Sequence, residues 1–148
     1  MQNKRVFPTK RSIKRMAVIS LLYQSELLEE QINVGQIFQD HPELDSEQIK
    51  MFKFIAKNYS LLQKLIAAHL NSQWQWERIL PLNRAILLYG ISELFFSEHR
   101  IVINEMIEIS KEFTADGDKD YGFINAVIEN VYQYLKRKKI IYEPESKN

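Results

Sequence analysis

Apolar residues recur every three or four positions along almost all of this 148-residue chain, which is the spacing of a buried helix face. Only four glycines and four prolines interrupt the pattern, and no two neighbouring segments read as a pair of strands. The pattern predicts helices over residues 9–30, 34–38, 45–70, 82–96, 102–113 and 120–138, with a short helix or turn over 71–79. We therefore expect an all-α fold of six to seven helices.

Two local features add detail to this helical pattern. Asp45 followed by Gln48 is a capping-box pattern, which predicts a helix start. Residues 82–96 are apolar on nearly all sides, as in a helix at the centre of a bundle. A chain of this length is expected to form one domain. We divide it into a basic N-terminal arm (1–9), a helical domain (10–139) and a polar C-terminal tail (140–148).

Positive charge is concentrated at the start of a chain whose net charge is only +1. No acidic residue occurs before Glu26, and the basic positions are Lys4, Arg5, Lys10, Arg11, Lys14 and Arg15. Cations at a helix N-terminus oppose the helix dipole, so this placement is unfavourable for the helix itself. A local positive field favours contact with phosphates, and a solvated charged face is the alternative.

Other chemistry has little support in the sequence. There is no cysteine, the three histidines lie far apart, and we predict no metal, cofactor or catalytic residue. The alternating aspartates at 116, 118 and 120 resemble a calcium loop, but its required Gly and Glu positions hold Tyr121 and Val127. The start of the chain lacks an apolar signal segment and no apolar run is long enough to span a bilayer, so we expect a cytoplasmic protein.

Asn104, Glu105 and Glu108 are predicted to share one polar edge of their helix. Two neighbouring carboxylates are able to do acid–base work. The favoured interpretation is structural, with acids in the first turn stabilised by the helix dipole.

Three segments resemble the NusB family of bacterial transcription antitermination and ribosomal-RNA processing factors. The first is the basic entry from Arg11 to Arg15, continuing through Leu22 and Tyr23, and the second is Arg84-Ala85-Ile86-Leu87 with Glu93-Leu94. The third and most specific is Ile103-Asn104-Glu105, Glu108, Lys111 and Phe113, followed by Phe123-Ile124-Asn125.

The resemblance implies an all-helical fold of two packed subdomains without enzymatic activity. It also implies pairing with NusE, a small-subunit ribosomal protein, binding of single-stranded boxA RNA in nascent ribosomal-RNA transcripts, and support of RNA polymerase as part of an antitermination complex. The RNA contacts it implies are Lys10, Arg11, Lys14 and Arg15, with the aromatic residues Tyr23 and Phe123.

The chain departs from the family pattern at several of these positions. Ser12 and Ile13 interrupt the basic cluster, Lys14 stands where alanine is usual, and Met16 stands where glutamate is usual. Asn83 replaces an acidic residue on the surface that the resemblance assigns to NusE.

The partner surface is predicted around the end of the central helix. Aromatic residues and arginine dominate interface energetics, which adds Phe95, Phe96 and Arg100 to Asn83. One alternative is a helical protein–protein adaptor without an RNA role. Another is a NusB-like fragment of a ribosomal-RNA cytosine methyltransferase, which we disfavour because the sequence ends soon after its last helix. The sequence leaves open whether the free protein is a monomer or a homodimer.

Overall fold

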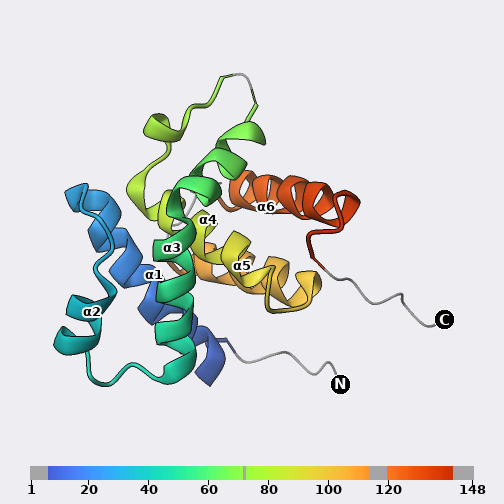
Figure 1. Cartoon of the computed structure of the whole chain (residues 1–148). Helices are drawn as coiled ribbons and strands as arrows, with labels where there is room; N and C mark the ends of the chain where they lie inside the picture. The colour runs from blue at the N-terminus through green and yellow to red at the C-terminus, as the bar shows by residue number, and fades with distance from the viewer. Residues whose placement is uncertain (1–6, 72, 114–119, 142–148) are drawn as a thin grey trace, which may run out of the picture.

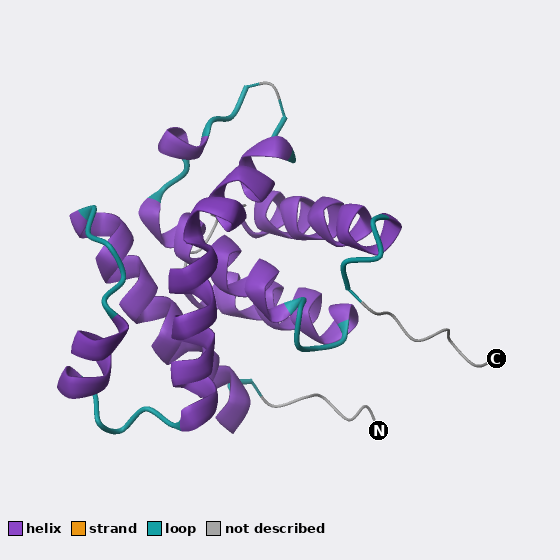
Figure 2. Ribbon diagram, viewed as in Figure 1, coloured by secondary structure: helices purple, strands orange, loops and turns teal. Residues whose placement is uncertain are grey.

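Six α-helices and one short 3-10 helix make up the regular structure of the computed structural model, which describes residues 7–71, 73–113 and 120–141 (Figures 1 and 2). They are α1 (Lys10–Leu28), α2 (Val34–Asp40), α3 (Ser46–Ala68), η1 (Trp76–Arg78), α4 (Pro81–Glu93), α5 (His99–Phe113) and α6 (Asp120–Arg137). No strand occurs in the described ranges. The predicted all-α class is confirmed.

The helix starts follow from capping chemistry. Thr9 caps α1 by accepting a hydrogen bond from the Ser12 backbone N–H, and Asp45 caps α3. The capping box predicted for Asp45 and Gln48 is present, with each side chain accepting from the other residue's backbone N–H at 2.8 Å.

Most helix boundaries differ from the sequence prediction by one to three residues, and two of these differences have a clear physical reason. Pro81, which lies just before the predicted helix 82–96, is the first residue of α4, where its fixed φ suits the helix and its missing N–H costs nothing. The α5 helix begins at His99, three residues before its predicted start at residue 102. The His99 ring stacks on Tyr132 of α6 at a centroid distance of 3.9 Å, so a tertiary contact accompanies the extra turn.

The central helix of the fold is α4, as the apolar pattern predicts. Every residue from Ala85 to Glu93 is buried, and α4 contacts α1, α3, α5 and α6. Figure 1 shows α1–α3 on one side of α4, and α5 with α6 on the other. A Cβ added at Gly90 would lie 2.9 Å from Met106 Cγ, so the close packing of α4 and α5 requires glycine there.

Buried ion pairs join α1 to α4 near both of their ends. Arg15 near the start of α1 binds Glu93 at the end of α4, and Glu26 near the end of α1 accepts a hydrogen bond from Arg84 Nε at 2.8 Å. The Tyr59 hydroxyl of α3 also donates to Glu26, at 2.7 Å. The two helices therefore run antiparallel, and this arrangement fixes where the first turns of α1 lie.

Some of the sequence predictions fall on residues that the structure does not describe. The division into arm, domain and tail stays a prediction, since residues 1–6 and 142–148 lie outside the described residues, as do the aspartates 116 and 118. None of the helices described here is long and apolar enough to cross a membrane.

Candidate functional site

The basic side chains that open α1 separate into an exposed set and a buried one. Lys10, Arg11 and Lys14 are exposed, whereas Arg15 is only 8% exposed. We call the exposed set, Lys10, Arg11 and Lys14, the basic edge.

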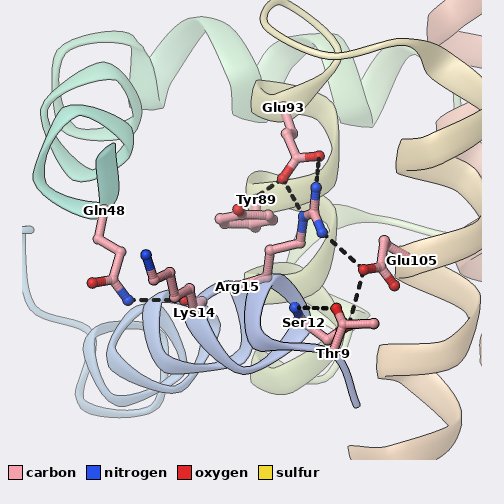
Figure 3. Close-up of polar contacts among 8 residues, drawn as sticks. All are labelled: Thr9, Ser12, Lys14, Arg15, Gln48, Tyr89, Glu93 and Glu105. Atoms are coloured by element: carbon pink, nitrogen blue, oxygen red, sulfur yellow. Dashed lines mark hydrogen bonds and ion pairs between the residues drawn. The ribbon is translucent and has the colours of Figure 1, made fainter. Parts of the chain in front are cut away.

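Arg15 is enclosed by carboxylates from two other helices (Figure 3). Its Nε and Nη2 donate to the two carboxylate oxygens of Glu93 at 2.7 and 3.1 Å, and its Nη1 donates to Glu105 Oε1 at 2.8 Å. The Ser12 hydroxyl donates to the same Glu105 oxygen at 2.9 Å, and the Tyr89 hydroxyl donates to Glu93 at 2.8 Å. We call these five residues the Arg15 network.

Two expectations about this network are wrong. Arg15 was expected to project from the surface beside Arg11, and Glu105 was expected on a polar edge, yet Glu105 is 0% exposed. The reason is tertiary: where α1 packs against α4 and α5, a buried guanidinium and buried carboxylates satisfy one another. The structure therefore gives Arg15 an anchoring role.

The electrostatics agree with tight pairing in the Arg15 network. Burial alone would lower the pKa of Arg15, but its hydrogen bond to Glu93 and the nearby negative charges outweigh burial and raise it. Burial, together with the Glu93 charge, raises the pKa of Tyr89. Arg15 thus stays charged and Tyr89 stays a hydrogen-bond donor.

Lys14 faces α3 rather than open solvent alone. Its Nζ lies 2.7 Å from Asp45 Oδ2, and Gln48 Nε2 donates to the Lys14 carbonyl at 3.1 Å. The hydrogen bond between Lys14 and Asp45 raises the pKa of the lysine and lowers the pKa of the carboxyl. The basic edge therefore carries two cations, Lys10 and Arg11, and one that is partly neutralised by Asp45.

The predicted aromatic contacts are not on the basic edge. Tyr23 is half-buried against the core and lies about 14 Å farther along α1 than Lys14, at 1.5 Å per residue. Phe123 is half-buried on α6, with its ring 5.1 Å from that of Trp74.

The four predicted partner residues do not form one patch. Asn83 is buried at the start of α4, whereas Phe95 and Phe96 follow its end, about 20 Å away by helix rise. Phe95 is half-buried against Phe54, at 5.3 Å between ring centroids. Phe96, at 45% exposed, and the exposed Arg100 of α5 are the accessible members of the set.

The sequence interpretation missed the role of two residues at this end of the molecule and overlooked a third. Glu93 and Glu105 were named but not as partners of Arg15, although each is an acidic residue within an otherwise apolar stripe. Lys50, in the second turn of α3, places its Nζ 4.7 Å from the centre of the Phe96 ring, and no sequence signal pointed to it.

These features define a class of small all-α domains in which two groups of helices share one buried central helix. The sequence profile of the NusB family matches residues 12–133. This chain belongs to the NusB family.

Individual relatives agree with the family assignment. Transcription antitermination protein NusB of Staphylococcus haemolyticus is 31% identical over 128 residues, covering 82% of this chain and 98% of the relative. The protein of the same name from Bacillus cereus is 30% identical over 133 residues, covering 85% and 99%. The solved structure of T. maritima NusB superposes with a TM-score of 0.70 at 25% identity, covering 84% of this chain and 92% of that one.

Proposed function

We propose that this protein is an RNA-binding transcription antitermination factor without enzymatic activity. It pairs with NusE, binds boxA-type single-stranded RNA of nascent ribosomal-RNA transcripts, and supports the processivity of RNA polymerase. Membership of the NusB family and the antitermination names of its relatives support this proposal.

The observation that carries the RNA role is the basic edge. Lys10 and Arg11 are exposed on the first turn of α1, and Lys14 lies one turn farther along. The Arg15 network fixes this turn against α4 and α5, so the backbone that carries the cations is in place before any ligand arrives. Phosphate contacts are the main source of affinity for nucleic acid, and a pre-organised edge lowers the entropic cost of making them. Tyr23 and Phe123 remain proposed base contacts.

Salt dependence of boxA RNA binding tests this proposal. Each phosphate contact contributes about −0.7 to the log–log slope for a single strand, so Arg11→Ala flattens the slope by about 0.7. Arg11→Ala with Lys14→Ala flattens it by more than this and by at most about 1.4, because Asp45 partly neutralises Lys14. Lys64→Ala, on the far half of α3, is the matched control and leaves the slope unchanged. An unaltered slope in the double variant would remove the basic edge from the RNA interface.

The partner is proposed to dock where α4 gives way to α5. Arg100 is exposed there and Ile101 beside it is 41% exposed, which provides a cation next to an apolar contact. When this protein and NusE are bound to each other, each contacts the same RNA strand and the two contacts act together. The affinity for boxA RNA is therefore expected to rise when NusE is added. Binding of NusE without any binding of RNA would instead support the adaptor function.

A further inference from the structure

A cleft of about 410 Å³ opens next to the basic edge, between the first turns of α1 and α3 and the end of α4. Its buried floor is formed by Arg15, Tyr89 and Glu93 of the Arg15 network. Its volume lies in the range of sites that enclose small organic molecules, about 300–1,000 Å³. There is room for one planar base with its flanking backbone outside.

One wall of this cleft is an aromatic ring that is fixed in place. Phe96 is 45% exposed, and the edge contact with Phe54 holds its ring at 5.1 Å and 78°. Lys50 Nζ lies 4.7 Å from the ring centre. Because the ring is already ordered, stacking a flat ligand on it costs little side-chain entropy.

Two cations around the cleft favour contact with the phosphates of a nucleic-acid backbone. Lys14 is held by Asp45 and Arg15 by Glu93, so Arg11 and Lys50 supply most of the attraction. Glu47 also lines the cleft and opposes that attraction. The cleft is therefore suited to a neutral base flanked by phosphates rather than to a compact polyanion.

We propose that this cleft is a base-binding subsite for single-stranded RNA. One unstacked base replaces the Lys50 ammonium over the Phe96 ring, and the phosphates on either side of the base contact Arg11 and the displaced Lys50. Single-stranded RNA is held in this way by aromatic rings and cations along a groove. The proposal rests on the proposed RNA-binding function and extends it, because Arg11 and Lys14 belong both to the basic edge and to the cleft. It routes the strand from α1 towards α3 and the end of α4.

Two substitutions separate stacking from charge in equilibrium titrations with boxA RNA. Phe96→Leu keeps an apolar side chain but removes the ring, so it weakens binding about 5- to 150-fold without changing the salt slope. Phe96→Trp retains a stacking surface and restores binding. Lys50→Gln flattens the slope by about 0.7. The matched controls are Phe38→Leu, an exposed phenylalanine of α2 that does not line the cleft, and Lys64→Gln; both leave affinity and slope unchanged.

A scan with abasic nucleotides identifies the stacked base directly. An abasic site keeps the phosphate and removes the base, so it weakens binding to the wild-type protein at every contacted position. At one position of the strand, the abasic site should cause no further loss of affinity in the Phe96→Leu variant. The abasic site and Phe96→Leu then remove the same stacking contact, so their effects are not additive. Fully additive losses at every position would overturn the proposal.

The outcomes also distinguish this subsite from the broader RNA role. RNA binding that depends on Arg11 and Lys14 but is indifferent to Phe96→Leu and Lys50→Gln overturns the subsite and leaves the proposed function intact. Loss of NusE binding in Phe96→Leu, with RNA binding unchanged, would reassign Phe96 to the protein partner. Absence of RNA binding by the wild-type protein would refute the proposed function itself.

Discussion

Arg15 lies where α1, α4 and α5 meet, and its three guanidinium nitrogens donate to Glu93 and Glu105. Removing these charges from water costs several kcal/mol per ion, and the hydrogen bonds within the network offset that cost. A cation held in this way stabilises the fold and orients the first turns of α1. The neighbouring Arg11 has the same charge but lies in solvent, so the two arginines are expected to respond to substitution in opposite ways.

The residue-scale prediction concerns this pair of arginines. Arg15→Ala leaves two buried carboxylates without their cation and should lower the free energy of unfolding by about 3–5 kcal/mol. Arg15→Lys should recover only part of this, because an ammonium group lacks the fork that binds Glu93 through two nitrogens. Urea denaturation measures both, and Arg11→Ala is the matched control, with a change within about ±0.5 kcal/mol.

One outcome would contradict the anchoring role of Arg15. If Arg15→Ala unfolds at the wild-type urea concentration but no longer binds boxA RNA, then Arg15 is an RNA contact rather than an anchor.

At the scale of helices, periodicity and caps predicted most of the architecture. The stripe of residues 45–70 and its capping box led to α3, and the apolar segment 82–96 led to α4 as the central helix. The predictions that failed depend on contacts between helices. Arg15 and Glu105 are 90 residues apart, so no local pattern reveals that each buries the other. Phe96 was predicted with Phe95 as a partner contact, but its cleft depends on Lys50 from a different helix.

The element-scale prediction concerns the start of α3. Asp45→Ala removes both the cap and the Lys14 contact and should lower stability by about 0.5–2 kcal/mol. Because the folded pKa of Asp45 is lowered, its charge stabilises the fold above its unfolded pKa. This contribution is lost as the pH falls through the folded pKa.

Thermal unfolding as a function of pH measures this effect. The stability difference between wild type and Asp45→Ala should be largest near neutral pH and shrink in acid. Glu30→Ala, at an exposed site beyond the end of α1, is the control, with a difference from wild type near zero throughout. If the stability difference between Asp45→Ala and wild type grows in acid, the assigned direction of the pKa shift of Asp45 is wrong.

At the scale of the whole molecule, the net charge of +1 means that attraction for RNA is local. The basic edge lies at the start of α1, and the cleft extends from it to Phe96 after the end of α4, whereas Arg100 lies on the first turn of α5. RNA and the partner protein are therefore proposed to use adjacent but distinct surfaces at this end of the molecule. Substitutions at one surface should leave the other active.

Arg100→Glu tests whether the two surfaces are separable. It should weaken NusE binding about fivefold or more, since truncating an important interface arginine costs over about 1 kcal/mol. It should leave boxA RNA binding by the isolated protein unchanged. Arg137→Glu at the end of α6 is a charge-matched control. Loss of both activities with an unchanged circular dichroism spectrum would show that the surfaces overlap.

The two buried pairs between α1 and α4 have opposite polarity. Along α1 the order is Arg15 then Glu26, and along α4 it is Arg84 then Glu93. If α4 ran parallel to α1, arginine would face arginine and glutamate would face glutamate in a dry core, at a cost of several kcal/mol for each unpaired charge. The pairs therefore select one direction of the central helix over its reverse, a choice that apolar side chains, which pack similarly either way, make only weakly.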